Sequence, residues 1–422
     1  MRRFALVLAV TGALLQPAAA VGAPGIQFGI QDDMWLQTGS LENRLNTLDR
    51  LGPDVVRYTL RWDHVARKRP KRATNPNDKA YDWSEVDPLL RGLRKHKIGV
   101  LVTLYGAPRW ANGHRAPNFA PSSKWSLSSF AVAAAKRYPW VSRWEVWNEP
   151  NLRTFLRPNS PRVYVTRLLN PTYDALHGVR RGIRVAGGAT SPRRTPSGIA
   201  PALFMRGMSA AHARLDVYSH HPYPVSRFET PSRANCHYCT GILTLARLPD
   251  LLAEVRRDFG PKRIWLTEYG YQTNPPDRYL GVSKAQQALY LAQAAYIAYK
   301  APQVDLLIHF LVRDESKSGR WQSGLMTVGG SPKPSFNAFA IPLAQLSHDG
   351  TSTVLWGQVR PGFGRQRYRI QRAVRGRWRD VESPQWTSPR GYFQRTVEAD
   401  PGARFRVLAV RKRISSLSVK VR

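Results

Sequence analysis

Residues 99–105 read Gly-Val-Leu-Val-Thr-Leu-Tyr, a short run that is almost continuously apolar and rich in strand-forming residues. Unbroken apolar runs of this length are typical of strands that are buried on both faces, as in a parallel sheet covered by helices. Seven more runs share these properties: Ile26–Ile30, Val55–Leu60, Val141–Val146, Val185–Ala189, Val217–His221, Ile264–Tyr269 and Val304–Phe310. The sequence therefore predicts eight buried parallel strands.

Stretches with helical periodicity follow these runs. They are Leu41–Leu51, Ser84–His96, Ser126–Lys136, Pro161–Val179, Ala200–Ala213, Pro249–Phe259, Ser283–Tyr299 and Pro334–Leu346. Ser40 precedes the first stretch and is a suitable N-cap. Eight strand–helix units in succession predict an α/β fold of the (β/α)8 TIM barrel type. A doubly wound open sheet is the alternative, although no Gly-rich phosphate-binding loop follows the first run.

The pattern changes after Leu346. Residues 347–350 are predicted to form a linker, and from Thr353 apolar and polar residues alternate in short segments separated by Gly, Pro and Asp. Such alternation predicts a small antiparallel, β-sandwich-like domain over residues 351–422, after a barrel domain over residues 24–346. The C-terminal segment is also strongly basic, with 17 Lys and Arg against four Asp and Glu.

The N-terminal residues 1–23 have the order of an export signal. Arg2 and Arg3 precede the apolar run Phe4–Leu15, and small residues around Ala20 and Ala23 offer cleavage sites. This order favours a removed signal peptide over a first barrel element and predicts a secreted protein. No later segment has the length and apolar character of a membrane span.

The two cysteines, Cys236 and Cys239, lie close together. A zinc site requires about four ligands, and no second cysteine pair occurs in the sequence. In an exported chain a small disulfide that pins a loop is the preferred interpretation.

The formal net charge is +36 at pH 7. A charge of this sign favours anionic partners such as acidic polysaccharide, cell-envelope polymers or nucleic acid. Arginines that simply lie solvated at the surface are an equally good interpretation. No nucleic-acid-binding motif is recognisable, so nucleic acid is not predicted as a partner.

Two acidic segments lie at predicted strand ends: residues 144–151 read Trp-Glu-Val-Trp-Asn-Glu-Pro-Asn, and residues 264–271 read Ile-Trp-Leu-Thr-Glu-Tyr-Gly-Tyr. Carboxylates at the C-terminal ends of barrel strands point into the mouth where active sites lie. Glu149 and Glu268 can therefore flank one glycosidic bond, one attacking the anomeric carbon while the other protonates the leaving oxygen. Their proximity would move their pKa values apart. The amide of Asn148 can donate to a sugar 2-hydroxyl.

Trp-Asn-Glu-Pro-Asn after the fourth run, with Thr-Glu-Tyr-Gly on the seventh, resembles clan A glycoside hydrolases, family 39 first and the family 5 cellulase-type enzymes next. The resemblance covers residues 26–346. It implies that Glu149 is the acid/base, that Glu268 is the nucleophile, and that the anomeric configuration is retained. No metal-ligand set is evident in the sequence and this mechanism needs none, so no metal or cofactor is predicted.

Further positions match this clan. Arg57 resembles the arginine beneath the nucleophile, where a nearby cation keeps a carboxylate ionised. His220-His221-Pro222-Tyr223 resembles the clan's His-x-Tyr, which implies that Tyr223 donates to the nucleophile and that His221 orients the site or binds sugar. His220 is interpreted as a core histidine.

Trp62 and Trp110 are predicted to lie at the mouth and stack on sugar rings, with ordinary packing as the alternative. Trp144 and Trp147 are interpreted as core residues. The eighth run lacks the tryptophan that many clan members carry there, so Phe310, Arg313 or Trp321 is expected to replace it. Arg109 and Arg313 are candidates for pairing with an anionic sugar such as a uronic acid.

The sequence thus predicts a secreted retaining O-glycosyl hydrolase that acts on a polysaccharide or oligosaccharide. A barrel that binds polysaccharide or cell wall without cleaving it is the alternative. The basic C-terminal domain is interpreted as an anchor to anionic cell-envelope polymer or as a carbohydrate-binding accessory.

Overall fold

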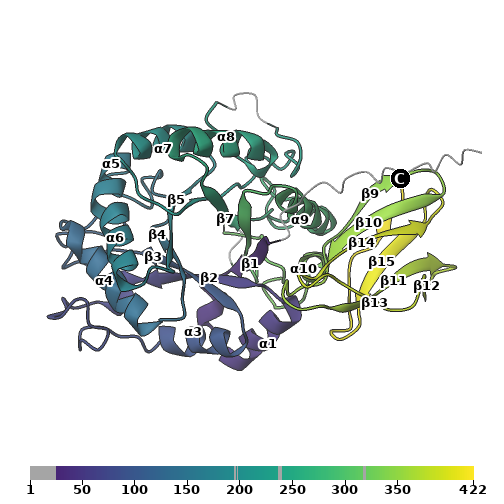
Figure 1. The fold of residues 1–422 in the computed structure, drawn as a ribbon, viewed down its shortest axis with the longest axis horizontal. Coiled ribbons are helices and arrows are strands. Elements are labelled where there is room, and N and C mark those ends of the chain that lie inside the picture. Colours follow the sequence, from purple (N-terminus) through teal and green to yellow (C-terminus); the bar gives the residue numbers. More distant parts are fainter. Residues whose placement is uncertain (1–24, 194–195, 197, 236–239, 317–319) are drawn as a thin grey trace, which may run out of the picture.

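The computed structural model describes residues 25–193, 196, 198–235, 240–316 and 320–422. The predicted signal peptide and the predicted disulfide between Cys236 and Cys239 lie outside the described residues. Figure 1 shows a ring of strands surrounded by helices, with a group of antiparallel strands beside it. Within the described residues, no helix combines the length and apolar character needed to cross a membrane.

Eight parallel strands close into a barrel in chain order. They are β1 (Gln27–Gln31), β2 (Val55–Arg61), β3 (Gly99–Tyr105), β4 (Arg143–Val146), β5 (Arg184–Thr190), β6 (Val217–His220), β7 (Arg263–Tyr269) and β8 (Val304–Phe310). The first strand pairs with β2 through Gly29–Val55 and with β8 through Gly29–Ile308, so the sheet has no edge. The predicted (β/α)8 barrel is confirmed, and closure excludes the doubly wound open sheet.

The strands carry an apolar layer of their own, separate from the main core. It contains Val55, Leu101, Ala186, Val217, Trp265, Leu306 and Ile308. Side chains two residues apart on a strand point to the same face. Arg57 and Thr103 therefore continue the direction of Val55 and Leu101 one layer nearer to the C-terminal ends of the strands. A polar layer thus lies directly on an apolar one inside the barrel, as the layered filling of such barrels allows.

Helices cover the outside of the barrel (Figure 1). They are α1 (Leu41–Leu51), α2 (Trp62–Val65), α3 (Val86–Lys95), α4 (Lys124–Arg137), α5 (Pro161–Val163), α6 (Asn170–Val179), α7 (Pro201–Ala210), α8 (Leu248–Phe259), α9 (Lys284–Tyr299) and α10 (Pro334–Ala340), with short helical turns η1 (Trp35–Gln37), η2 (Tyr164–Leu169) and η3 (Leu245–Arg247). Ser40 caps α1 by accepting from the backbone of Asn43. Ser283 and Gln286 form a capping box at α9.

The helix predicted over residues 161–179 is not continuous. Its middle, η2, is a π-helical segment between α5 and α6. The backbone N–H of Asn170 donates to the carbonyl of Val165, one residue farther back than in an α-helix. Pro171 has no N–H to continue the α-helical pattern at this point, which favours the wider turn.

The last predicted helix, residues 334–346, is wrong in its second half. Helix α10 ends at Ala340, and residues 343–348 form strand β9, which pairs with β10. The segment 347–350, predicted to be a linker, therefore begins inside a strand. Apolar residues at 343 and 346 fit helical spacing, but the open edge of β10 provides the pairing that makes this segment a strand.

The C-terminal strands form two antiparallel sheets. Their strands are β9 (Leu343–His348), β10 (Ser352–Gln358) and β14 (Tyr392–Glu398) in one, and β11 (Arg367–Val374), β12 (Arg377–Asp380), β13 (Gln385–Trp386), β15 (Arg404–Ala409), β16 (Ile414–Ser415) and β17 (Val419–Lys420) in the other. Leu355 and Phe393 of the first sheet share a core with Ile370 and Val407 of the second. The predicted antiparallel C-terminal domain is confirmed.

This domain contacts the barrel where the barrel strands begin. The Asp54 carboxylate, just before β2, accepts from the backbone N–H of Phe28 at 2.9 Å and of Gly362 at 2.7 Å. The guanidinium of Arg360 is fully buried, 4.1 Å from the ring centre of Phe28 and 4.3 Å from that of Phe339. Desolvation lowers the pKa of Arg360 to about 10, which leaves it charged at neutral pH.

Candidate active site

The backbone after β4 turns sharply and directs Glu149 into the barrel mouth. Trp147 and Glu149 have φ angles of 72° and 36°, in the left-handed region that residues other than glycine rarely adopt. The N–H of Glu149 donates to the carbonyl of Ala189 at 2.9 Å, and the N–H of Trp147 donates to Leu104 at the same distance. Bonds to both neighbouring strands thus hold a backbone conformation that costs about 1–3 kcal/mol per residue.

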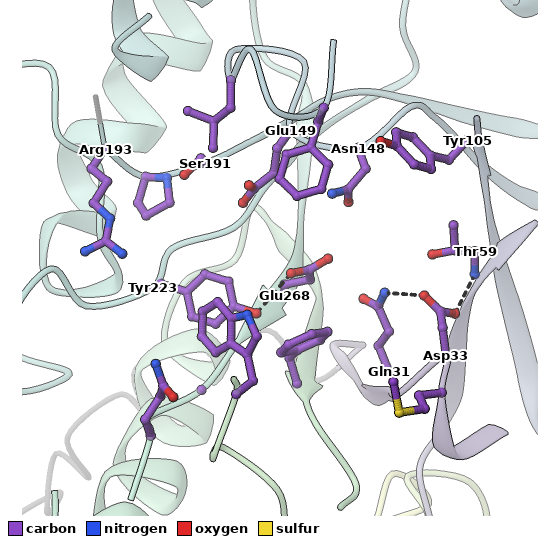
Figure 2. Close-up of a pocket in the computed structure, with 18 of the residues that line it drawn as sticks. Gln31, Asp33, Thr59, Tyr105, Asn148, Glu149, Ser191, Arg193, Tyr223 and Glu268 are labelled. Atoms are coloured by element: carbon purple, nitrogen blue, oxygen red, sulfur yellow. Dashed lines mark hydrogen bonds between the residues drawn. The ribbon is translucent and has the colours of Figure 1, made fainter. Parts of the chain in front are cut away.

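Glu268, near the end of β7, faces Glu149 across the mouth (Figure 2). Both side chains are buried, and carboxylate oxygens of the two residues lie within 4.8 Å of each other. The structure therefore brings together the two acidic residues that the sequence singled out. One small group bound between them can therefore contact both carboxyl groups.

Arg57 lies beneath this pair with no exposed surface. Its guanidinium donates to Oε1 of Glu268 at 2.6 Å, to Oδ1 of Asn148 at 2.9 Å and to the side-chain oxygen of Gln31. On its other side it contacts Oε2 of Glu145 at 2.6 Å. The arginine thus does not reach the cavity as a substrate ligand. It holds the Glu268 carboxylate and the Asn148 amide in place from below.

Glu145 is a site residue that the sequence analysis missed. It is fully buried on β4 and accepts from Thr103 Oγ1 at 2.8 Å as well as from Arg57. A charge in a buried strand is costly unless it is paired. A glutamate between Trp144 and Val146 in an apolar strand was therefore the signal in the sequence for a buried ion pair. With Glu145 and Glu268 on either side, the Arg57 charge is fully compensated.

Tyr223 and His221, which follow β6, complete the contacts of the two acids. The Tyr223 hydroxyl donates to Oε2 of Glu268 at 3.0 Å. Nδ1 of His221 lies 3.0 Å from Oε1 of Glu149 and 3.6 Å from Oε2 of Glu268. Burial, aided by the charge of Arg57, lowers the pKa of His221 far below its usual value, so the ring is neutral. Neighbouring His220 is a core residue, bonded to Thr190 and the Leu243 carbonyl, as predicted.

Burial and mutual repulsion separate the proton affinities of the two acids. Burial, reinforced by the charge of Glu268, raises the pKa of Glu149 to about 8, against the opposing charges of Arg57 and Arg193. Burial also raises the pKa of Glu268, but the Arg57 charge and the bonds from Tyr223 and Arg57 oppose that rise. Glu149 is therefore the acid that keeps its proton to higher pH, and Glu268, which has the closer cation, is the more readily ionised of the two.

The two acids open into a cavity of about 680 Å³, a volume that suits a small-molecule or sugar site. Asn148, Tyr223, Phe310 and Trp321 line it. The last three form an aromatic wall, with Tyr223 and Trp321 ring centres 4.9 Å apart and Phe310 edge-on to Trp321 at 5.3 Å. Phe310 and Trp321 thus lie where the sequence analysis expected a replacement for the strand-eight tryptophan.

Several predicted mouth residues lie elsewhere. Trp62 is fully buried and stacks on Phe130, and Trp110 packs edge-on against Trp62 and donates to the Ala66 carbonyl. Neither lines the cavity. Trp62 has no exposed surface, so the prediction that it stacks on sugar is wrong, whereas for the partly exposed Trp110, which lies outside the cavity, stacking stays a prediction. Trp144 and Trp147 are core residues, as interpreted.

Arg109 and Arg313 also lie outside the cavity lining, and the backbone N–H of Arg313 donates to Asp32. Three other charged residues line the cavity: Asp33, Arg61 and Arg193. Asp33 follows β1, Arg61 is the last residue of β2, and Arg193 follows β5. Each lies outside any motif or periodic run, so the sequence offered no signal for their direction. Figure 2 places Asp33 on one side of the Glu149–Glu268 pair and Arg193 on the other.

Glu149, His221 and Glu268 present donor atoms close enough together to hold a metal ion. Arg57, however, already provides a positive charge 2.6 Å from Glu268, and Tyr223 donates to its second oxygen. A divalent cation would have to share this carboxylate with a buried guanidinium. The donor set therefore fits acid–base chemistry better than metal binding.

Fold and site together define a (β/α)8 barrel with a paired-carboxylate centre at its mouth. Its fold is similar to a family 39 glycoside hydrolase from the gut symbiont Bacteroides cellulosilyticus, with a TM-score of 0.56, 18% identity, and coverage of 90% of this chain and 80% of that one. It is also similar to a calcium-binding mutant of Bacteroides uniformis β-glucuronidase 2, with a TM-score of 0.50 and 12% identity over 94% of this chain and 45% of that one. The resemblance to family 39 is thereby confirmed for the fold. No protein-family model and no curated protein matches the sequence.

Proposed function

We propose that the protein is a retaining O-glycosyl hydrolase that cleaves a polysaccharide or oligosaccharide by double displacement. The observation that carries the proposal is the pair of buried carboxyl groups at the barrel mouth. They lie within 4.8 Å of each other, with a buried guanidinium against one and a raised pKa on the other. The glycosidase folds to which the chain is similar support the same class of reaction.

In the first step, an oxygen of Glu268 attacks the anomeric carbon, and the bond from that carbon to the leaving oxygen breaks. Glu149 gives its proton to the leaving oxygen, so a neutral alcohol departs and a glycosyl ester of Glu268 remains. In the second step, Glu149 takes a proton from water as the water oxygen attacks the anomeric carbon. The Glu268 carboxylate is released, and two inversions give overall retention.

Neighbouring residues stabilise particular steps of this reaction cycle. Arg57 stabilises the Glu268 carboxylate before attack and after release, and the Tyr223 hydroxyl does the same at the other oxygen. Asn148, held by Arg57, presents its amide nitrogen to the cavity, where it can donate to the 2-hydroxyl of the reacting sugar. Phe310 and Trp321 of the aromatic wall offer apolar surface to a sugar face.

A panel of 4-nitrophenyl glycosides and of polysaccharides tests this function. We expect release of nitrophenol or of reducing ends from at least one member, and proton NMR of the first product should show the anomeric configuration of the substrate. A protein that binds a glycan of the panel without releasing product would be the non-catalytic barrel instead. An inverted product would contradict the double displacement.

The pH dependence follows from the two acids. The general acid must be protonated, so kcat/KM should fall as pH rises through the pKa of Glu149, about 8. The nucleophile must be ionised, so activity should also fall as pH drops through the raised pKa of Glu268. A bell-shaped profile with its alkaline limb near pH 8 is the expected result of measuring kcat/KM from pH 4 to 10. An alkaline limb that persists in Glu149→Gln, assayed with a dinitrophenyl leaving group, would assign that limb to another residue.

We also propose that the protein is exported and that a signal peptide within residues 1–23 is removed by cleavage after Ala20 or Ala23. Mass spectrometry of the protein recovered from culture medium should find a mature N-terminus at Val21 or Pro24. An intact Met1 in extracellular protein would contradict cleavage at these sites.

The basic C-terminal domain is proposed to hold the enzyme on an anionic cell-envelope polymer. Its exposed residues Arg375, Arg377 and Arg379 lie at the β11–β12 hairpin, and no carboxylate among the described residues forms an ion pair with them. Replacing all three with Gln should lower the salt concentration that elutes the protein from purified cell wall, because fewer charges contact the polymer.

A matched control changes three exposed cations of the barrel domain, Arg67, Lys68 and Arg69, to Gln. This control should elute like the unchanged protein. If both triple variants eluted at the same lowered salt concentration, net charge, and not the C-terminal domain, would hold the protein on the wall.

A further inference from the structure

The cavity is electrically asymmetric around the two catalytic carboxyl groups. Its lining includes two arginines, Arg61 and Arg193. Arg61 is neutralised locally, since it donates to both oxygens of Asp63 at 2.8 and 2.6 Å. Arg193 differs, because no carboxylate of the described part of the chain lies within ion-pair distance of it. The cavity therefore presents one uncompensated guanidinium to whatever enters.

The backbone that carries Arg193 is fixed to the catalytic strand. The N–H of Ser191 donates to Oδ1 of Asn151 at 2.9 Å, and the Asn151 amide donates to the Ser191 carbonyl at 3.3 Å. The N–H of Leu243 donates to the carbonyl of Pro192 at 2.9 Å. Asn151 belongs to the same turn as Glu149, so the backbone of residues 191 and 192, which leads directly to Arg193, is held relative to the acid. Arg193 itself forms part of the cavity wall, which an arginine on the outer surface would not.

Arg193 lies on the side of Glu149 that faces away from Asn148 (Figure 2). In the proposed function, Asn148 contacts the 2-hydroxyl of the sugar that Glu268 attacks, so that sugar extends toward Gln31 and Asp33. The leaving group, which receives the proton of Glu149, then extends the opposite way, toward Arg193. The charge of Arg193 also acts on Glu149 itself, because it opposes the rise that burial imposes on the pKa of this acid.

We propose that Arg193 binds an anionic substituent, a carboxylate or a sulfate ester, on the leaving-group side of the substrate. The inference rests on the proposed glycosidase function and names the substrate class of the same site. A guanidinium presents two parallel N–H donors that match the oxygens of either group. Asp33, on the other side of the acid pair, disfavours an anion there, so the charge of the substrate also sets its orientation.

The test compares three aryl glycosides of the sugar that the panel identifies, with leaving phenols that carry a 3-carboxamide, a 3-carboxylate or a 3-sulfate group. The unchanged enzyme should show a higher kcat/KM for one or both anionic phenols than for the amide. Arg193→Gln should reduce the ratio of anionic to amide kcat/KM by about tenfold or more, since a hydrogen bond to a charged group is lost. The carboxylate and sulfate arms show which anion fits the site.

Arg193→Lys should keep part of the preference, because it retains the charge without the paired donors. Arg109→Gln removes the same charge from an exposed position outside the cavity and should keep the full preference. Arg193→Gln should also move the alkaline limb to higher pH, since a charge that opposes protonation of Glu149 is removed. An unchanged anionic-to-amide ratio in Arg193→Gln would overturn the inference alone, whereas failure to cleave any glycoside would overturn the proposed function with it.

Discussion

Glu268→Gln is expected to lower kcat for a cleaved aryl glycoside by about 10⁴-fold or more, because the amide can neither attack the anomeric carbon nor carry the covalent intermediate. The substitution preserves size, and Arg57 keeps its contact with Glu145, so the fold should remain. Pre-steady-state and steady-state release of the aryl group measure the loss. Circular dichroism and the thermal midpoint verify that the variant is folded.

Glu149 provides the matched comparison. Glu149→Gln should reduce kcat/KM by about 10²–10⁴-fold for a poor leaving group, and far less for a dinitrophenyl group, which departs without protonation. Azide distinguishes the two roles, since it can replace water in a site that lacks one carboxylate. With Glu149→Ala it should give a glycosyl azide of retained configuration, and with Glu268→Ala one of inverted configuration. The opposite pair of configurations would exchange the two assignments.

Arg57→Met is expected to destabilise the protein by about 3–5 kcal/mol, the usual effect of removing one partner from a buried ion pair. The guanidinium has no exposed surface and lies between two carboxylates, so its loss leaves Glu145 and Glu268 buried without a cation. Urea denaturation measures the change in unfolding free energy. Arg109→Met, at an exposed position, should change it by less than about 0.5 kcal/mol.

A double variant separates the lost pair from lost packing. If the cost of Arg57→Met arises from uncompensated charge, Arg57→Met combined with Glu145→Gln should be less destabilising than the sum of the two single changes. The acid limb of the pH profile should also move to higher pH in Arg57→Met, since the cation that lowers the pKa of Glu268 is gone. If the changes in unfolding free energy were additive and the acid limb did not move, Arg57 would contribute by packing and not by its charge.

The barrel could be predicted because its signal is repeated and local. Each buried strand is an apolar run, and eight of them alternate with helical stretches, so errors at single boundaries do not change the fold. The exception, residues 341–348, shows the limit of such reasoning. Apolar residues at 343 and 346 suit a helix or a strand, and the pairing with β10 that decides between them depends on a partner later in the chain.

The site residues also fall into two groups: those whose position the barrel determines and those whose position local packing determines. Glu149 and Glu268 could be predicted because closing a parallel sheet brings all strand ends to one mouth. Trp62 could not be placed correctly, because an aromatic residue just after a strand can point into the mouth or under the helices, and packing against Phe130 decides it. Arg193 was missed because it lies in an irregular loop, where no period gives the direction of a side chain.

The contacts of Asp54 and Arg360 have a consequence for how the molecule can be presented to a polymer. They attach the C-terminal sheets, which lie beside the barrel, near the starts of its strands, whereas the cavity opens at the end where the strands finish. A molecule immobilised through its C-terminal sheets would therefore keep its entrance clear of the attachment site. Protein attached in this way to beads or to a cell wall should still bind long polysaccharide chains that approach its cavity from the surrounding medium.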